Sequence, residues 1–183
     1  MKKVIIITGH LAALKSTVST KLGNDLGIIV FNKDDLKEVL GKTIGFKTRA
    51  DNLKLSLATF KLMVKLMKDT LKVNECVILE SNFRLKEFVQ ISEMCRRLGY
   101  DKTVIFMSGD PQVLYQRYKK RQPYRDKVHT STGLLDFDTF KSVLVVFDKQ
   151  YYGEDAIYLD TSTFEESDYQ SLLHKVIDRL DGK

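Results

Sequence analysis

The chain has few of the residues that mark linkers, and it has no long apolar run. Its 183 residues include two prolines and no tract rich in glycine and serine, and no segment repeats. We therefore expect residues 1–183 to form a single domain, which is long enough to bury a proper core. No apolar stretch approaches the roughly 18–20 residues that span a bilayer. The first residues also lack the apolar region and cleavage site of a signal peptide, so no membrane partner is expected.

Cysteine is also scarce. Cys76 lies in an apolar strand-like run and Cys95 in a helical one. We expect both to be reduced core residues of a cytoplasmic protein, since no cysteine and histidine cluster has metal-ligand spacing. The formal net charge of +6 favours an anionic partner, such as a nucleotide, a phosphorylated substrate or nucleic acid. A charge of this size also serves solubility, so it does not choose among these partners.

The segment Gly9–Thr17 is almost a complete phosphate-binding loop. The P-loop pattern is G-x-x-x-x-G-K-[ST], and Gly9, Lys15 and Ser16 occupy its positions. Leu14 stands where the second glycine belongs. In such a loop the amide N–H groups converge on the phosphates, the lysine adds positive charge and the hydroxyl binds Mg²⁺. The residues expected to bind nucleotide are Gly9, His10, Leu11, Ala12, Ala13, Leu14, Lys15, Ser16 and Thr17.

The leucine at position 14 is the main departure from the pattern. Every residue except proline supplies an N–H, so Leu14 can still donate to a phosphate. Glycine adds tolerance of positive φ, and a leucine in the left-handed conformation costs roughly 1–2 kcal/mol. The alternative is an ordinary strand, turn and helix with a lysine in the first turn.

Apolar runs and amphipathic segments alternate along the chain. The runs predict buried parallel strands, and the segments between them predict helices. This alternation predicts a three-layer α/β fold in which right-handed crossovers bring the strand carboxyl ends, and the ligand site, to one edge. The predicted strands are Lys3–Thr8, Ile28–Phe31, Cys76–Glu80, Thr103–Met107 and Ala156–Leu159. The predicted helices are Ser16–Asp25, Asn52–Lys72, Arg84–Leu98, Pro111–Arg121, Phe137–Gln150 and Phe164–Leu180.

Several residues are suited to the ends of these helices. Ser16 is of a residue type that caps a helix start, and Gly27 suits the end of the same helix. Gly99 follows the third predicted helix in the same way. Asp110 and Pro111 suit the N-cap and first position of the next helix.

The longest predicted helix carries two stripes. Its apolar stripe has spacings of three and four residues, as a core-facing helix requires. Its basic stripe is either a solvated face, which we favour, or a track for nucleic acid. The apolar stripe consists of Leu53, Leu57, Phe60, Val64, Met67 and Leu71, and the basic stripe of Lys54, Lys61, Lys65, Lys68 and Lys72.

Carboxylates follow two of the predicted strands. Glu80 ends the third strand, where an acidic residue could hold Mg²⁺ or cap the next helix. Asp34 and Asp35 follow the second strand, and either could accept a proton from an acceptor hydroxyl. Adjacent carboxylates at this junction also suit helix capping and the helix dipole. We assign Asp34 as the base and Asp35 to the first helical turn.

A basic cluster follows the fourth strand. Arg117 and Arg121 are four residues apart and so share a helix face. Pro123 ends that helix, and a polar segment to Gly133 leads into the next one. The segment is either a closing lid, whose arginines reach a γ-phosphate, or a solvated basic loop. The cluster consists of Arg117, Lys119, Lys120, Arg121, Arg125 and Lys127, and His129 lies in the same segment.

Together these motifs resemble the P-loop kinases of the zeta-toxin, chloramphenicol phosphotransferase and polynucleotide-kinase-like group. The resemblance covers most of the chain, and Ala12 and Leu14 stand where this group usually has glycines. It implies a P-loop NTPase fold with a five-stranded parallel sheet of order 2-3-1-4-5 and a short lid at about 121–136. It rests on the segments Ile7–Thr17, Asn32–Lys37, Val77–Arg84 and Gln116–Arg121.

The resemblance also implies roles for individual residues. It makes Lys15 the phosphate-binding lysine and Ser16 the metal hydroxyl. The acceptor side falls on Asp34, with Asp35 beside it, and on Arg84 after the third strand. Thr161 and Ser162, after the fifth strand, lie where related kinases pass the adenine. The lid arginines are Arg117, Arg121 and Arg125.

These features predict an ATP-dependent, Mg²⁺-dependent phosphotransferase. The acceptor would be a hydroxyl of a small molecule or of a nucleotide-like compound, which this family resemblance does not name. Two alternatives stay open: a nucleotide-binding module that has lost transfer activity, and a 5′-hydroxyl polynucleotide kinase. The oligomeric state does not follow from the sequence.

Overall fold

The structure is a computed structural model, which describes residues 1–130, 133–147 and 152–182. Five parallel strands form one sheet in the order β2-β3-β1-β4-β5. The predicted α/β fold class and strand order are therefore confirmed. The strands are β1 (Lys3–Gly9), β2 (Val30–Asn32), β3 (Cys76–Glu80), β4 (Asp101–Ser108) and β5 (Ile157–Asp160).

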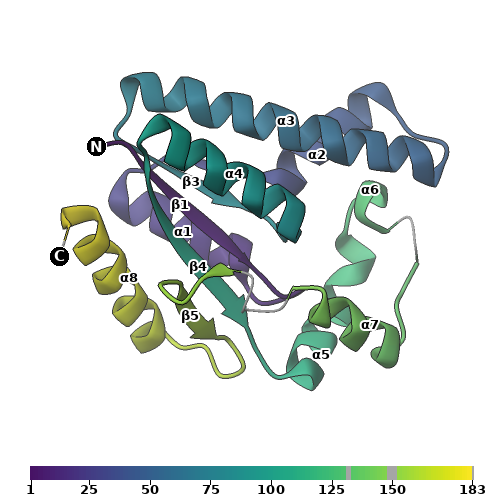
Figure 1. Cartoon of the computed structure of the whole chain (residues 1–183). Helices are drawn as coiled ribbons and strands as arrows, with labels where there is room; N and C mark the ends of the chain where they lie inside the picture. Colours follow the sequence, from purple (N-terminus) through teal and green to yellow (C-terminus); the bar gives the residue numbers. More distant parts are fainter. Residues whose placement is uncertain (131–132, 148–151, 183) are drawn as a thin grey trace.

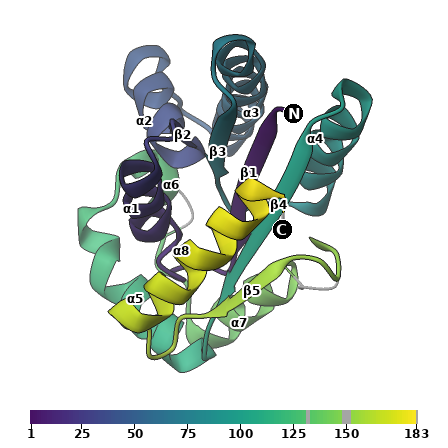
Figure 2. The ribbon, with the colours of Figure 1, turned by 90° about the vertical axis from the view of Figure 1, so that its left-hand side faces the viewer.

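Helices cover both faces of the sheet. Figures 1 and 2 show α3 and α4 on one face and α1 and α8 on the other. The helices are α1 (Lys15–Leu26), α2 (Lys33–Ile44), α3 (Arg49–Val73), α4 (Leu85–Leu98), α5 (Pro111–Arg121), α6 (Lys127–Thr130), α7 (Phe137–Val145) and α8 (Glu166–Asp181). A single 3₁₀ turn, η1 (Gln122–Tyr124), joins α5 to α6. No helix among the described residues is long and apolar enough to cross a membrane.

The strand β1 shows why a continuous apolar run forms the centre of this sheet. Val4 and Ile6 contribute to the core cluster beneath α3 and α4. Ile5 and Ile7 contribute to the cluster beneath α1 and α8. Successive side chains of a strand point to opposite faces, and helices cover both faces of a parallel sheet. The four central positions of β1, Val4–Ile7, are therefore all apolar, which is the pattern that predicted the strand.

The end of α1 and the start of β2 differ from the prediction because of a local hydrogen bond. The N–H of Ile28 donates to the carbonyl of Gly23, so Ile28 closes α1 and β2 begins only at Val30. Gly27 ends α1 in the left-handed conformation, as predicted. The predicted cap at Ser16 is wrong, because α1 begins one residue earlier and its N-cap position is Leu14.

Two further predictions about helix ends are confirmed. Asp110 accepts hydrogen bonds from the N–H groups of Gln112 and Val113, and Pro111 opens α5. Gly99 ends α4 in the left-handed conformation. The helix α7 ends at Val145, whereas the prediction extends it to Gln150; residues 148–150 lie outside the described part of the chain.

The long helix α3 follows its predicted stripe only in its second half. Phe60, Val64, Met67 and Leu71 are buried against the sheet. Leu53 and Leu57 are 56% and 55% exposed, so the prediction is wrong there. Figure 1 shows the first half of α3 extending past the sheet, where it lies beside α2. Contact with α2 instead buries the helix face of Asn52, Leu55 and Thr59.

Candidate active site

The predicted phosphate-binding loop, Gly9–Thr17, joins β1 to α1 in an unusual backbone conformation. Ala12 and Leu14 have φ angles of 61° and 58°, and they are the only described residues other than glycine with positive φ. These are the two positions where the resembling kinases usually have glycine. The loop therefore keeps the backbone shape of a glycine-containing loop, at a cost of roughly 1–2 kcal/mol for each such residue. Leu14 packs against the core cluster under α1, which offsets part of that cost.

The start of the loop requires its glycine. Gly9 has φ of 123°, and a Cβ there would overlap the carbonyl oxygen of Met107 on β4. The next amide, that of His10, donates to the same carbonyl at 2.8 Å. The loop is thus fastened to β4 before it turns toward α1.

Lys15 is buried at the first position of α1. Its Nζ donates to the carbonyl oxygen of His10 at 2.6 Å, which spans the loop. Burial lowers the pKa of the Lys15 ammonium to about 8, and the nearby Glu80 carboxylate opposes this change. A phosphate within the loop would favour the charged form, because an opposite charge in a buried site raises the pKa of an amine.

The carboxylate of Glu80 lies beside the loop because β3 pairs with β1. Ile7 and Asn32 are both in register with Glu80 in the sheet. The hydroxyl of Ser16 donates to Glu80 Oε2 at 3.0 Å, and the side-chain amide of Asn32 donates to the same oxygen. Burial raises the pKa of Glu80 to about 7, although Lys15 opposes it. Glu80 does not cap α4, whose N-cap position is Arg84.

Ser16 and Glu80 together fit a Mg²⁺ site of the kind found in nucleotide-binding proteins. Both offer oxygen ligands, and Mg²⁺ is commonly held by one or two protein oxygens together with phosphate and water. A buried carboxylate whose pKa is raised gains most from a cation. The described residues contain no group of three or more histidine, cysteine, aspartate or glutamate side chains that could hold a metal alone, so the phosphates would supply the other ligands.

The structure separates the roles of the two adjacent aspartates. Asn32 caps α2: its Oδ1 accepts hydrogen bonds from the N–H groups of Asp34 and Asp35 at 2.8 and 3.3 Å. Both aspartates therefore lie in the first turn, as predicted for Asp35, and the N-cap residue is Asn32. Asp34 lines the main cavity and Asp35 does not.

Asp34 is surrounded by cations. Its Oδ2 accepts a hydrogen bond from Arg125 at 2.7 Å, and its Oδ1 lies 3.7 Å from His129 Nδ1. Burial pulls the pKa of Asp34 upward, but the charges of His129, Arg125 and Lys15 outweigh it and hold the pKa below the ordinary value. Asp34 is thus ionised at neutral pH, as a proton acceptor must be.

The three lid arginines line the same cavity from α5 and the turn after it. Arg117 donates to the hydroxyl of Thr161 at 3.3 Å and to the carbonyl of Ser162 at 3.4 Å. Arg121 is largely buried, and its Nε has no hydrogen-bond partner among the described residues. Burial and the neighbouring Arg125 lower the pKa of Arg121 to about 10. This guanidinium is placed to receive an anion.

Thr161 does not face the cavity. Its side chain is fully buried, and its hydroxyl donates to the carbonyl of Ser108. Its hydroxyl also accepts a hydrogen bond from Arg117, so Thr161 supports this arginine. A nucleotide contact at Thr161 stays a prediction.

The expected lid is partly helical and is anchored to α2 and α3. Val128 in α6 is buried, and its carbonyl accepts hydrogen bonds from Asn52 Nδ2 at 2.9 Å and Lys37 Nζ at 3.4 Å. Lys37 also donates to Asn52 Oδ1 at 2.5 Å. A Cβ on Gly41 would lie 3.1 Å from Val128 Cγ2. Residues 131 and 132 of the predicted lid lie outside the described part of the chain.

The contacts of Lys37, Asn52 and His129 were not predicted from the sequence. The available signals were an asparagine on the inner side of α3 and a glycine, Gly41, within α2. The imidazole of His129 lies between two carboxylates, since its Nε2 is 3.3 Å from Glu38 Oε1 and its Nδ1 faces Asp34. Burial lowers the pKa of His129, and Asp34 opposes this effect.

One cavity of about 860 Å³ brings these groups together. It lies at the carboxyl ends of the strands, between α2 and α3 on one side and α5 and α7 on the other (Figure 1). Gly9 and His10 are not among its lining residues. The predicted site residues that line it are Leu11, Ala12, Ala13, Leu14, Lys15, Ser16, Thr17, Asp34, Glu80, Arg84, Arg117, Arg121 and Arg125.

Comparison with solved structures places the chain in the fold of the P-loop kinases. A presumed kinase from Chloroflexus aurantiacus superposes with a TM-score of 0.81 at 23% identity, over 97% of each chain. Shikimate kinase from Bacteroides thetaiotaomicron gives 0.63 at 15% identity, over 98% of each chain. A gluconokinase from Sinorhizobium meliloti gives 0.61 at 14% identity, over 97% of this chain and 95% of that one. No family model matches the chain, and no curated protein matches it in sequence.

Proposed function

We propose that the protein is an ATP-dependent phosphotransferase, which moves the γ-phosphoryl group to a hydroxyl of a small molecule. The observation that carries this proposal is the single cavity in which the phosphate loop, Asp34, Glu80 and three arginines meet. The shikimate kinase and gluconokinase structures of the same fold support a small-molecule acceptor. Membership of the zeta-toxin and chloramphenicol phosphotransferase group is a further part of the proposal.

The loop and the first turn of α1 would hold the triphosphate. Their amide groups and the N-terminal end of the α1 dipole favour phosphate oxygens, and Lys15 would exchange its bond to the His10 carbonyl for one to a phosphate. Ser16 and Glu80 would hold Mg²⁺, which supplies neutralisation of phosphate charge when bound. Two free cysteines, Cys76 and Cys95, agree with a reducing compartment such as the cytoplasm.

The transfer step needs a base and a cationic cover. The acceptor oxygen bonds to the γ-phosphorus while the bond to the β–γ bridging oxygen breaks, so that ADP leaves. Asp34 accepts the hydroxyl proton, because it is ionised and lines the same cavity. Arg121, largely buried and without an acidic partner in the described residues, stabilises the charge on the transferring group.

Calorimetric titration with Mg²⁺·ATP is the first test of this function. We expect binding by the wild type and a loss of at least tenfold in affinity for Lys15→Ala, since a charge-assisted contact to phosphate is removed. Absence of binding at millimolar nucleotide would falsify the proposal. An acceptor-dependent release of ADP, lost in Asp34→Asn while ATP binding is kept, then identifies an enzyme.

A nucleotide-binding module without transfer activity is the second candidate. The strained residues Ala12 and Leu14 favour it, because their side chains limit how closely a phosphate approaches the loop. If the protein binds the nucleotide but releases no ADP with any acceptor tested, this candidate is selected.

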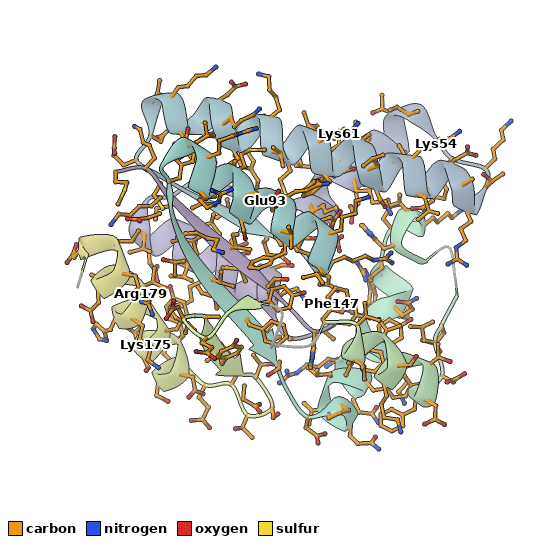
Figure 3. All side chains as sticks on the ribbon, in the orientation of Figure 1. Lys54, Lys61, Glu93, Phe147, Lys175 and Arg179 are labelled. Carbon is orange, nitrogen blue, oxygen red and sulfur yellow. The ribbon has the colours of Figure 1, made fainter. Side chains whose placement is uncertain are left out.

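A polynucleotide kinase finds less support in the surface charge. Lys65 and Lys72 of the basic stripe form ion pairs with Asp69, so only part of the stripe remains available to a phosphate backbone. Lys54 and Lys61 are exposed on α3, where Figure 3 labels them. Transfer to an oligonucleotide with a steep dependence on salt would select this candidate.

A further inference from the structure

The wall of the cavity carries many more cations than carboxylates. Asp34 and Glu80 are its two acidic residues, and Asp34 is already paired with Arg125. Of the cations, Lys33 is paired with Glu87. The cationic residues that line the cavity are Lys15, Lys33, Lys37, Arg49, Arg84, Arg117, Lys120, Arg121 and Arg125. The cavity as a whole therefore attracts anions.

A nucleotide would use only the cations near the phosphate loop. Lys15 opens α1, and Arg117 and Arg121 come from α5. Arg49 and Arg84 come from a different part of the wall, because Arg49 is the first residue of α3 and Arg84 is the N-cap residue of α4. Among the described residues, neither forms an ion pair with a carboxylate. The N-terminal ends of two helices add positive potential at the same places.

Exposed apolar side chains lie in the same cavity. Leu53 comes one helical turn after Arg49 on α3 and is 56% exposed. Val146, which follows α7, is 55% exposed, and Val143 lines the cavity beside it. Phe147, labelled in Figure 3, forms part of the wall from the core side. Exposed apolar groups that gather in a concave site mark the place of an apolar part of a ligand.

We propose that the acceptor is an alcohol that also carries an anionic group and an apolar portion. The anionic group, a carboxylate or a phosphate, binds Arg49, Arg84 or both. The apolar portion contacts Leu53 and Val146, and the hydroxyl is directed to Asp34. This inference rests on the proposed function, and it names the acceptor class of that site.

The charge balance also excludes cationic acceptors. A primary amine near Arg49 and Arg84 would meet like charges. Of the two lining carboxylates, Asp34 is paired with Arg125, and Glu80 accepts hydrogen bonds from Ser16 and Asn32 beside the loop. An amino alcohol therefore binds worse than a neutral alcohol of the same shape, and an anionic alcohol binds better.

Four para-substituted benzyl alcohols of similar size test this preference. They are 4-(hydroxymethyl)benzoate, 4-(hydroxymethyl)phenyl phosphate, the neutral 4-(hydroxymethyl)benzamide and the cationic 4-(aminomethyl)benzyl alcohol. With a saturating non-hydrolysable ATP analogue and Mg²⁺, we expect one or both anions to bind at least tenfold more tightly than the amide, and the amine to bind worst. The relative affinities of the two anions decide between a carboxylate and a phosphate.

Matched variants assign the effect to the two arginines. At least one of the variants Arg49→Gln and Arg84→Gln should reduce the preference for an anion about tenfold, as expected for one charge-assisted hydrogen bond. Lys54→Gln removes the same charge from the exposed part of α3 outside the cavity and should change nothing. Nucleotide affinity, measured alone, should stay unchanged in all three variants.

The outcomes separate this inference from the proposed function. Failure to bind Mg²⁺·ATP contradicts the proposed function itself. If ATP binds normally, three results contradict the acceptor assignment alone. The neutral or cationic alcohol binds as tightly as the anions, neither anion binds at millimolar concentration, or both arginine variants keep the wild-type preference.

Discussion

The guanidinium of Arg125 donates a hydrogen bond to the carboxylate of Asp34, with 2.7 Å between Nη2 and Oδ2. Asp34 lies in the first turn of α2, and Arg125 follows the turn after α5, so the bond joins segments 91 residues apart. A base that is paired in this way binds a proton weakly. If Asp34 is the base of the proposed transfer, its bond to Arg125 lowers its affinity for the hydroxyl proton. Transfer would then be favoured when Arg125 exchanges this carboxylate for the transferring phosphoryl group.

Replacing Arg125 should therefore change the pH dependence of transfer. In Arg125→Met, the pKa of Asp34 rises, because one of the cations that hold it low is lost. The base is active when unprotonated, so the acidic limb of the profile of kcat/KM against pH moves to higher pH. The maximal rate should also fall about 10²-fold, since a cation over the transferring group is removed. Lys127→Met, an exposed neighbour outside the cavity, is the control, and an unshifted acidic limb in Arg125→Met contradicts the pairing argument.

The left-handed conformation of Leu14 makes an unusual prediction about stability. Leu14→Ala and Leu14→Gly both lose the packing of the side chain, but only glycine relieves the strain at φ 58°. The glycine variant should be the more stable of the two by about 1 kcal/mol, in contrast to the usual order in a helix. Urea unfolding of both variants measures the difference. The same pair of changes at Ser19, inside α1 with ordinary helical φ, should give the opposite order.

Glu80 should make the stability fall as the pH rises from about 4.5 to 7. The pKa of Glu80 is raised to about 7 in the folded protein, whereas the unfolded chain has the ordinary value near 4.3. Between these values the folded form holds the proton more tightly, so stability decreases with rising pH and levels off above pH 7. Glu80→Gln should show a smaller decrease between pH 5 and 8, measured by urea unfolding without metal.

Mg²⁺ should act on the same carboxylate. At pH 8, Mg²⁺ with ATP should raise the melting temperature of the wild type more than that of Glu80→Gln, because binding to the folded state stabilises it. Glu93→Gln, an exposed carboxylate on α4 that Figure 3 labels, should behave as the wild type in both experiments. Equal pH dependence in Glu80→Gln and Glu93→Gln is the result that contradicts the assignment.

The hydrogen bonds of Asn52 should hold α6, the helical part of the predicted lid, in place. Asn52→Leu keeps the size of the side chain but removes its hydrogen bonds with Val128 and Lys37 in a buried site. We expect a loss of roughly 1–3 kcal/mol in the free energy of unfolding, since buried polar groups lose a partner. Lys54→Gln on the same helix should stay within about 0.5 kcal/mol of the wild type. A loss in Asn52→Leu no larger than in Lys54→Gln would mean that α6 does not depend on this contact.

The local parts of the fold were predictable because each depends on neighbouring residues. The apolar run of β1, the glycines at the ends of α1 and α4, and the cap at Asp110 all act within one or two turns of the chain. The phosphate loop is contiguous in the sequence, so its position was predictable too. Its departures at Ala12 and Leu14 mark the two left-handed residues, although the sequence alone cannot show their φ angles.

The predictions that were wrong concern side chains whose surroundings are set by other elements of the fold. Leu53 and Leu57 continue the apolar stripe of α3, yet the sheet ends before it reaches them. Ser16 has the chemistry of a cap, but its hydroxyl is directed to Glu80 because β3 lies beside β1.

The sequence by itself determined the alternation of strands and helices, the phosphate loop and the set of charged residues available to a site. Hydrophobic periodicity and turn chemistry act locally, so they can be recognised in one chain. Only the tertiary structure decided that Asp34 rather than Asp35 faces the cavity, that Arg125 pairs with it, and that Asn52 anchors α6. These choices depend on distances between residues remote in the chain, which only the packing of the helices on the sheet determines.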